Sequence, residues 1–290
     1  MKFKRIIPIL FSGLTIMSCR HIPEEVPQKL EVTLEPLWTS DTSLRVPESA
    51  LYHPSSNVIY VSNINGFNPS IPDGDGFISK LNPDGTTNEL HWVKGLNDPK
   101  GLCIFKNSLF VADIKELKEI DLTTGAVINI YSSPKAVFLN DVAVDKKGKV
   151  FVSDNESGII FTILGDSLSI VKEYAGANGL LLEEGKILAA SISTGNVDFI
   201  NGQGNLTPLT TGIANADGIG KDSYSNFLIS NWDGEVYYVK RNGEKTVILD
   251  TKAQGYSAAD IDVIPGSNTL LVPTFFTNTI AAYKIKYKLK

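Results

Sequence analysis

The sequence predicts an all-β protein, a six-bladed β-propeller, and two observations lead to this fold class. A motif of two short strands joined by a tight turn recurs six times, at a spacing of about 40 residues. No stretch of the chain has the apolar spacing of a long amphipathic helix. Four short antiparallel strands per repeat of this length are typical of a propeller blade, whereas a β-sandwich does not repeat one motif in this way.

Each repeat opens with a polar residue, then a small or acidic residue, then an apolar run. The first positions are Glu48, Lys100, Asn140, Asn178, Asp217 and Ala259, and the steps between them are 52, 40, 38, 39 and 42 residues. The long first step contains an insertion over 64–76, and we expect this insertion to cover one mouth of the central channel.

A third and a fourth strand follow each motif, for example over 117–121 and 127–131 in the second repeat. The last repeat supplies only three strands, which are expected over 259–264, 269–273 and 279–286. A strand expected over 30–34 would complete this repeat as its outermost strand. Joining both ends of the chain in one blade removes an open sheet edge, so the propeller is expected to span 30–290.

The segment 1–19 is expected to be a lipoprotein signal peptide. Basic residues at positions 2, 4 and 5 precede an apolar stretch that is too short for an ordinary spanning helix. The stretch ends at Ile16-Met17-Ser18-Cys19, which resembles a bacterial lipobox with an atypical Met17 and with Cys19 as the lipidated residue. The alternative is an ordinary cleaved secretion signal. The polar, Pro-containing segment 20–29 would be a tether, so we expect an exported protein of the bacterial cell envelope that is held on the membrane through its lipid alone.

Composition limits the partners. The formal net charge is −5 and the Lys and Arg residues are scattered, which argues against a nucleic-acid partner. If Cys19 carries a lipid, Cys103 is the one remaining thiol and no internal disulfide can form. We therefore expect a monomer that is stabilised by its apolar core and binds a small molecule.

The repeat also predicts a site. The innermost strand of a blade begins beside the central axis, so the residue that opens each repeat should point into the mouth of the channel. Four of these residues carry side-chain oxygen donors, namely Glu48, Asn140, Asn178 and Asp217. Hard cations such as Ca²⁺ take this ligand set. The alternative is that the Asn-Asp, Asn-Gly and Asp-Gly pairs are ordinary turn residues.

These motifs resemble the regucalcin/gluconolactonase family, whose relatives include paraoxonase, diisopropyl fluorophosphatase and strictosidine synthase. The matching motifs are Glu48 in PESALYHP, Asn140-Asp141, Asn178-Gly179-Leu180 and Asp217-Gly218. They stand in the order and in the blades that the family uses. The resemblance spans roughly 30–290 and rests on short motifs.

The resemblance implies that Glu48, Asn178 and Asp217 hold a divalent cation, with Ca²⁺ the first choice. Asn140 would contact the cation through water or the substrate. The implied activity is hydrolysis of a lactone or related ester, in which the metal polarises a substrate oxygen and Asp217 acts as base or nucleophile.

Two residues depart from the family pattern. Phe138 stands where gluconolactonase-like members often carry an Arg, so a sugar-acid lactone is not supported. Lys100 is expected in the same mouth, either as a catalytic clamp on the substrate or as an ammonium in the place of the cation. The second and third repeats also resemble NHL-type propellers, which mostly bind partners. A non-catalytic propeller that binds a ligand or a protein is therefore the alternative function.

The second strand of each blade should return to the same face and bring further side chains to the rim. The residues expected there are Asn63, Asp113, Asp154, Ser191, Asn231 and Thr274. Three aromatic residues beside them, Trp232, Phe275 and Phe276, either line a small-molecule pocket or pack between blades.

Overall fold

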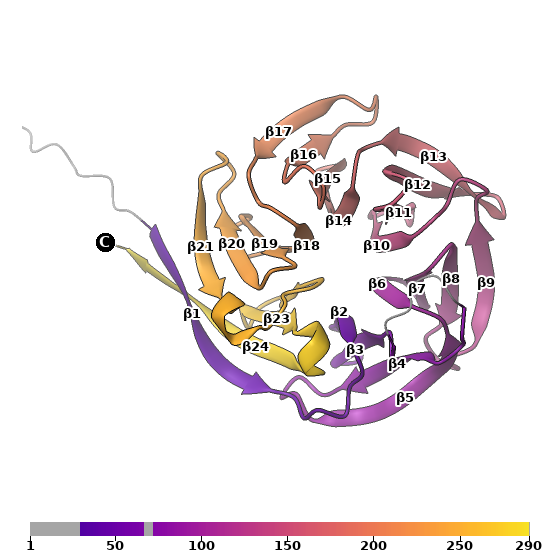
Figure 1. Ribbon diagram of the computed structural model, residues 1–290, viewed down its shortest axis with the longest axis horizontal. Coiled ribbons are helices and arrows are strands. Elements are labelled where there is room, and N and C mark those ends of the chain that lie inside the picture. The colour runs from indigo at the N-terminus through magenta and orange to yellow at the C-terminus, as the bar shows by residue number, and fades with distance from the viewer. Residues whose placement is uncertain (1–29, 67–71, 290) are drawn as a thin grey trace, which may run out of the picture.

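The computed structural model describes residues 30–66 and 72–289, and within them 24 strands form five sheets around a common centre (Figure 1). The prediction of an all-β propeller is confirmed. The leader, the tether and Cys19 lie outside the described residues, as do residues 67–71 of the insertion. None of the helical segments within 30–66 and 72–289 has the length and apolar character needed to cross a bilayer.

Four of the sheets are four-stranded antiparallel meanders, and in three of these the strands follow one another in chain order. The first contains β2 (Pro47–His53), β3 (Val58–Asn63), β4 (Gly76–Leu81) and β5 (Thr87–Leu96). Another contains β14 (Ala177–Glu183), β15 (Lys186–Ser191), β16 (Val197–Ile200) and β17 (Leu206–Thr210). The next contains β18 (Ala216–Lys221), β19 (Phe227–Asn231), β20 (Glu235–Val239) and β21 (Lys245–Asp250).

The stretch of chain between β5 and β14 forms one eight-stranded sheet. Its first half contains β6 (Pro99–Phe105), β7 (Ser108–Asp113), β8 (Glu116–Asp121) and β9 (Val127–Ser132). Its second half contains β10 (Leu139–Val144), β11 (Val150–Asp154), β12 (Ile159–Leu164) and β13 (Ser167–Glu173). The halves are joined by one parallel pair, Ser167 with Ser132, between the outer strands β13 and β9.

The last sheet joins the two ends of the described chain, as the sequence predicted. It contains β22 (Asp262–Ile264), β23 (Thr269–Pro273), β24 (Ile280–Leu289) and β1 (Leu30–Thr39). The outermost strand β1 pairs antiparallel with β24 from Leu30 opposite Leu289 to Thr39 opposite Ala281, so it is longer than the expected 30–34. Short 3₁₀ helices, η1 (Lys252–Gln254) and η2 (Phe275–Thr277), lie in the loops around β22 and β23.

The hydrophobic core lies between neighbouring sheets. Ile78 of β4 packs in one cluster with Leu102 of β6 and Val111 of β7, and Ala50 of β2 packs in another with Leu271 of β23. These side chains are almost fully buried, and each aliphatic one of the size of Leu or Ile contributes about 1.5–3 kcal/mol to folding. Packing of each sheet against the next closes the ring, because the first sheet also packs against the last.

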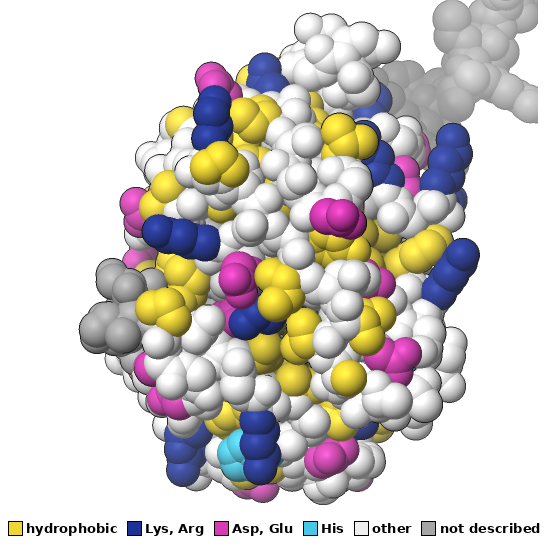
Figure 2. Space-filling model, turned by 90° about the vertical axis from the view of Figure 1, so that its right-hand side faces the viewer, with side chains coloured by type: hydrophobic (Ala, Val, Ile, Leu, Met, Phe, Trp, Pro, Cys, Tyr) yellow, Lys and Arg dark blue, Asp and Glu magenta, His cyan; other side chains and the backbone are white. Residues whose placement is uncertain are grey.

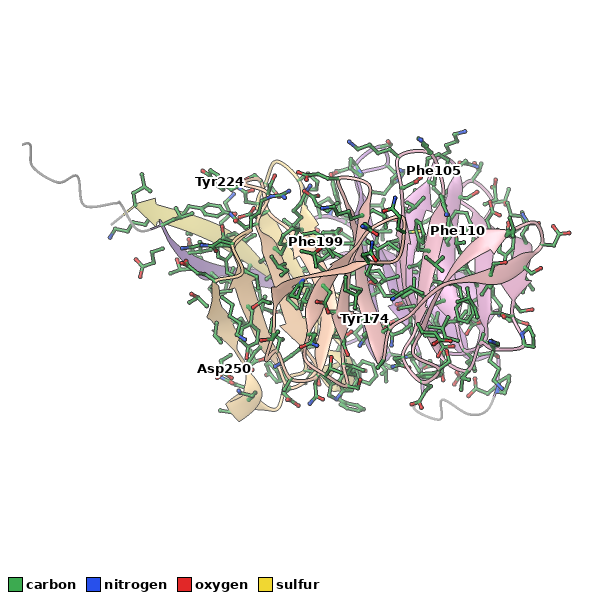
Figure 3. All side chains as sticks on the ribbon, turned by 90° about the horizontal axis from the view of Figure 1, so that it is seen from above. Phe105, Phe110, Tyr174, Phe199, Tyr224 and Asp250 are labelled. Carbon is green, nitrogen blue, oxygen red and sulfur yellow. The ribbon has the colours of Figure 1, made fainter. Side chains whose placement is uncertain are left out.

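The disc has two distinct faces. In the edge-on view of Figure 3, Phe105 and Tyr224, at or after the ends of inner strands, lie on one face, and Asp250, at the end of β21, lies on the other. The inner strands β2, β6, β10, β14 and β18 therefore begin on the Asp250 face. On the side surface shown in Figure 2, positive and negative side chains are interspersed with hydrophobic ones.

Candidate functional site

A cavity of about 240 Å³ lies where the inner strands begin. It is lined by Glu48, Lys100, Phe138, Asn140, Asn155, Asn178, Ile192, Asn215, Asp217, Trp232 and Phe275. The structure thus brings together the five polar residues that the sequence placed at the mouth of the channel. Ala259, the sixth first position, is fully buried and does not line this cavity.

A β-bulge directs each of these five side chains toward the channel. Every one of them is the second residue of its inner strand. The pairing register shifts at this point in all five strands, so that two inner-strand residues oppose one residue of the neighbouring strand. A bulge interrupts the ordinary alternation of side chains and re-aims one of them, which is a common device beside binding sites.

Serine hydroxyls complete the hydrogen bonding of three bulges. The backbone N–H groups of Ser49, Asp141 and Gly218 donate to the Oγ atoms of Ser62, Ser153 and Ser230 respectively, each at 2.9 Å. All three serines are fully buried and stand opposite the bulge on the second strand. They satisfy N–H groups that the interrupted ladder leaves without a backbone partner.

The five cavity-lining residues Glu48, Lys100, Asn140, Asn178 and Asp217 are called the ring residues below. Glycine follows three of them because neighbouring inner strands come very close there. A Cβ atom on Gly179 would overlap the carbonyl oxygen of Asp217, and one on Gly101 would lie 2.5 Å from the Cα atom of Asp141. A Cβ atom on Gly218 would lie 2.5 Å from the backbone nitrogen of Ile261. The glycines therefore set how closely the strands that carry the ring residues approach.

In the two remaining bulges, a polar residue follows the residue that lines the cavity: Ser49 follows Glu48, and Asp141 follows Asn140. Together with Asp260 they line a second, neighbouring pocket of the channel. Ser49 Oγ donates to Asp260 Oδ2 at 2.5 Å, which links the first and last sheets. The N–H of Leu180 donates to Asp141 Oδ2 at 2.6 Å, which links two further inner strands. Burial raises the pKa of both Asp141 and Asp260 well above the ordinary value of a carboxyl group.

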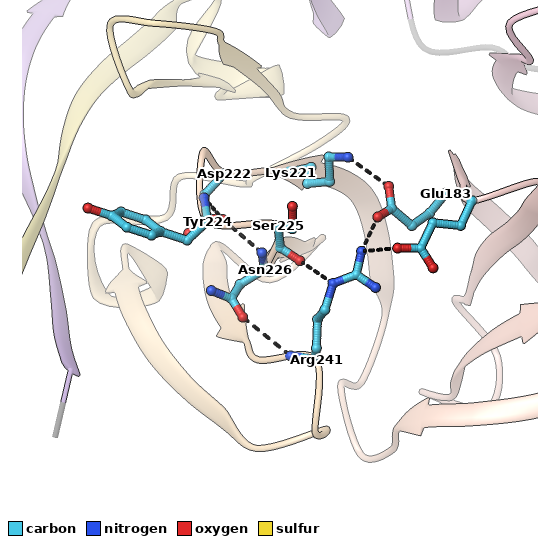
Figure 4. Close-up of polar contacts among 8 residues, drawn as sticks. Glu183, Lys221, Asp222, Tyr224, Ser225, Asn226 and Arg241 are labelled. Atoms are coloured by element: carbon cyan, nitrogen blue, oxygen red, sulfur yellow. Dashed lines mark hydrogen bonds and ion pairs between the residues drawn. The ribbon is translucent and has the colours of Figure 1, made fainter. Parts of the chain in front are cut away.

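The same inner strands are also tied together at their far ends. Glu183 at the end of β14 forms an ion pair of 2.7 Å with Lys221 at the end of β18, and Arg241 also pairs with Glu183 (Figure 4). Since β14 carries Asn178 and β18 carries Asp217, this network helps to fix the two strands that supply half of the oxygen donors.

Four buried oxygen atoms of cavity-lining residues have no hydrogen-bond partner: Asn155 Oδ1 and, among the five inner-strand residues, Glu48 Oε2, Asn140 Oδ1 and Asn178 Oδ1. Glu48, Asn140 and Asn178 are only 2–5% exposed. An unsatisfied buried acceptor costs about 1–3 kcal/mol, so several of them around one cavity point to a missing binding partner. Asn178 Nδ2 donates to the carbonyl oxygen of Ala216 at 3.4 Å, which turns its Oδ1 away from that strand.

Burial dominates the electrostatics of the two carboxyl groups. It raises the pKa of Glu48 to about 8, with a further increase from Asp217 and a partial opposing effect from the Lys100 ammonium. It also raises the pKa of Asp217 to about 7, opposed by Lys100 and by a hydrogen bond from Asn178. Without a bound cation, these two carboxyl groups therefore retain protons at pH values where exposed ones are ionised.

The donors fit a hard cation. Within residues 30–66 and 72–289 no group of three or more His, Cys, Asp or Glu side chains could hold a metal, but the cavity offers two carboxylates and two carboxamides instead. Oxygen donors of this mixture suit Ca²⁺. Lys100 opposes the fit, because its Nζ lies 3.7 Å from Glu48 Oε1.

The six residues that were expected at the rim end or directly follow the second strands, at the face where the inner strands begin, and there they have structural roles. Asp113 is buried and accepts hydrogen bonds from the N–H groups of Asn97 and Asp98, as well as from Lys118. Asp154 is buried and accepts from the N–H groups that precede β10 and from Ser157. None of the six residues expected there lines the cavity, because their side chains hold the loops between strands.

Sequence reasoning missed three lining residues, Asn155, Ile192 and Asn215. Asn155 and Ile192 directly follow β11 and β15, and Asn215 directly precedes β18. Their positions just outside the strands were the only available signal. Asn215 also adopts a left-handed backbone conformation, with φ of 50°, which Asn tolerates better than most residues.

Two of the three expected aromatic residues line the cavity. Trp232 and Phe275 contact each other edge to face, with ring centroids 4.4 Å apart. Phe276 packs on Phe275 but is 55% exposed and does not line the cavity. Phe138 and Ile192 are the other apolar residues that line the cavity, and together these four side chains are called the apolar wall below.

No protein-family model and no curated protein sequence matches the chain. Solved structures do. A gluconolactonase from Xanthomonas campestris has a TM-score of 0.68 at 12% identity, over 87% of this chain and 89% of that one. A second structure that carries the name gluconolactonase has a TM-score of 0.65 at 15% identity, over 89% and 93% of the two chains.

Propellers with a different activity are similar as well. A catalytically inactive variant of virginiamycin B lyase from Staphylococcus aureus, solved with quinupristin, has a TM-score of 0.61 at 13% identity, over 88% of this chain and 99% of that one. At these identities the likeness concerns the fold. The predicted resemblance to gluconolactonase-like propellers is confirmed at that level.

Proposed function

We propose that this chain is a six-bladed propeller that binds a divalent cation, Ca²⁺ in the first place, and hydrolyses a lactone or related ester. The blade count treats each half of the eight-stranded sheet as one blade, since a single residue pair links the halves. The observation that carries the function is the group of three unpartnered buried oxygens on Glu48, Asn140 and Asn178. Together with Asp217 they surround one cavity.

In this proposal Glu48, Asn178 and Asp217 hold the cation, and Asn140 contacts it through water or the substrate. The cation, when bound, polarises the carbonyl group of the substrate. Asp217 removes a proton from the attacking water and later returns it to the leaving oxygen. Alternatively, Asp217 attacks the carbonyl carbon itself, the alcohol oxygen leaves, and water then hydrolyses the resulting anhydride to release the acid and restore Asp217. Phe138, Ile192 and the Trp232–Phe275 pair enclose the apolar part of the substrate and limit access of water.

A second candidate is a non-catalytic propeller that binds a ligand or a protein. One specific observation favours it: the Lys100 ammonium lies 3.7 Å from Glu48 Oε1 and partly neutralises the ring without a metal. A lyase of the virginiamycin B type has less support. The inactive variant of that enzyme has a histidine replaced, whereas the described histidines here, His53 and His91, do not line the cavity.

We also propose that Cys19 carries a lipid and holds a monomeric propeller at the bacterial cell envelope. The support is the lipobox-like sequence that ends at Cys19 and the polar segment 20–29 between it and β1. In this arrangement the cavity binds a small-molecule substrate, and the protein contacts the membrane through the lipid alone.

The activity test is a panel of lactones and aryl esters assayed with Ca²⁺ and with a chelator. Turnover that requires Ca²⁺ and is lost in Asp217→Asn supports the hydrolase. Binding of Ca²⁺ without turnover of any compound in the panel favours the binding propeller instead.

A further inference from the structure

Among the five ring residues, Lys100 is the one whose side chain repels a cation. Its side chain is 6% exposed, and its Nζ lies 3.7 Å from Glu48 Oε1, which is longer than a hydrogen bond. The ammonium also lies 4.9 Å from the centroid of the Phe138 ring. It is therefore largely shielded from water and lies close to both the Glu48 carboxyl group and the Phe138 ring.

A divalent cation and this ammonium would lie close together in one cavity of low polarity. Their repulsion is relieved when an anionic oxygen lies between them. The Asp98 carboxyl does not line the cavity, so it cannot occupy that place. The anion that completes the site must come with the ligand.

The remaining lining residues indicate which kind of ligand, apart from its anionic group, the cavity can bind. Phe138, Ile192, Trp232 and Phe275 offer aromatic and aliphatic contacts. The amide groups of Asn155 and Asn215 are the remaining polar groups, and Asn155 Oδ1 is itself buried without a partner. A sugar would find few hydrogen-bond partners along such a wall, whereas an aromatic or aliphatic body would fill it.

We infer that Lys100 is a specificity-determining residue and that the site selects small molecules with a carboxylate on an aromatic or aliphatic body. The carboxylate binds between the Lys100 ammonium and the cation, and the body packs on the aromatic wall. This inference rests on the proposed function and narrows its substrate class to lactones or esters that carry a free carboxylate.

The test measures binding by calorimetry, with phenylacetate as the probe and neutral phenylacetamide as its matched compound. Wild type with Ca²⁺ should bind phenylacetate at least about tenfold more tightly than phenylacetamide, the ratio that corresponds to one ion pair of modest strength. Lys100→Met should reduce this preference, because the carboxylate keeps only its contact with the cation. The variant should also bind Ca²⁺ more tightly than wild type, because the competing charge is gone. The Ca²⁺ affinity is a readout that mere loss of packing would not raise.

Lys106→Met is the matched control, since Lys106 also lies over an aromatic ring, 5.2 Å from the centroid of Phe105, but outside the cavity. It should bind both compounds and Ca²⁺ as wild type does, and thermal unfolding establishes that each variant is folded. Equal binding of the two compounds to wild type, or an unchanged preference in Lys100→Met, overturns the inference while Ca²⁺ binding leaves the proposed function intact. A Lys100-dependent preference in a protein that binds no Ca²⁺ supports Lys100 as the residue that selects carboxylates, but it refutes both the metal-dependent function and the bridging position of the carboxylate.

Discussion

The stability of the protein should respond to Ca²⁺ in a strongly pH-dependent way. Glu48 and Asp217 are buried, and burial raises their pKa values from 4.5 to about 8 and from 3.8 to about 7. In the unfolded chain both groups are ionised above about pH 5, whereas in the metal-free folded protein they keep protons until about pH 7 to 8.

The sign of the effect follows from proton binding. Between about pH 5 and 8 the folded state binds more protons than the unfolded state, so metal-free stability falls as the pH rises. The slope is roughly 1 kcal/mol per pH unit for each carboxyl group. For a protein of this size, 1 kcal/mol corresponds to about 2–4 °C in Tm, so a rise from about pH 6 to 8 should lower the metal-free Tm by several degrees.

A cation requires both carboxylates in ionised form and releases their protons when it binds. Ca²⁺ should therefore raise Tm by several degrees at about pH 8.5 and by little at about pH 6. Asp141 and Asp260 titrate in the same direction and do not line the cavity, so they add to the fall in metal-free stability with pH. Their charges repel those of Glu48 and Asp217, so they act in the same direction as the ring carboxyl groups.

The assay is thermal unfolding followed by fluorescence, with Ca²⁺ or a chelator, over this pH range. Asp217→Asn is the control, because it removes one ionisable ligand with little change in volume and should lose most of the calcium response. An equal rise in Tm at both pH values, or no rise at either, would refute the reasoning.

Three further predictions concern the frame of the site and its anchor. Gly179→Ala should lower stability and abolish Ca²⁺ binding, because the added Cβ overlaps the carbonyl oxygen of Asp217; calorimetry and thermal unfolding check this, and a variant with wild-type values would contradict it. Ser49→Ala should cost about 1–3 kcal/mol, since Asp260 loses a buried hydrogen bond between the first and last sheets; chemical denaturation measures it, and an unchanged midpoint would argue against the role of this contact. Cys19→Ala should move the protein from the membrane fraction to the soluble fraction, and persistent membrane association would rule out lipidation at this residue.

The repeat made the architecture accessible from sequence. Spacing alone located the beginning of each inner strand, and so it named Glu48, Lys100, Asn140, Asn178 and Asp217 as one group. The unpaired first strand also indicated closure by the N-terminal strand, because three strands in the last repeat leave an open edge. Both predictions depend on a pattern that recurs along the chain, which a single sequence displays directly.

The detailed arrangement of the site could not be predicted in this way. The bulges that turn the ring residues inward depend on pairing with the second strand, and Ser62 or Ser230 shows its role only when it faces the bulge. Asp113 and Asp154 have the composition of site residues, but their carboxylates are used by backbone N–H groups of loops. A sequence does not reveal which polar groups fold back on their own backbone.

The distance between the Lys100 ammonium and the Glu48 carboxyl group could not be predicted from the sequence either. The sequence placed Lys100 in the mouth of the channel, but whether it clamps a substrate or neutralises the ring depends on its separation from Glu48. At 3.7 Å the pair is close enough to interact and too long for a hydrogen bond, so the ammonium keeps capacity for a further partner.

The most direct test of the account is calorimetric titration of the purified protein with Ca²⁺ at about pH 8.5, where both ring carboxylates are ionised. The account predicts one site per chain, weakened at least about tenfold in Asp217→Asn and in Asn178→Ala, which each lose a ligand. Lys106→Met should bind as wild type does. Absence of binding to the wild-type protein, or equal affinity in all four proteins, would contradict the account.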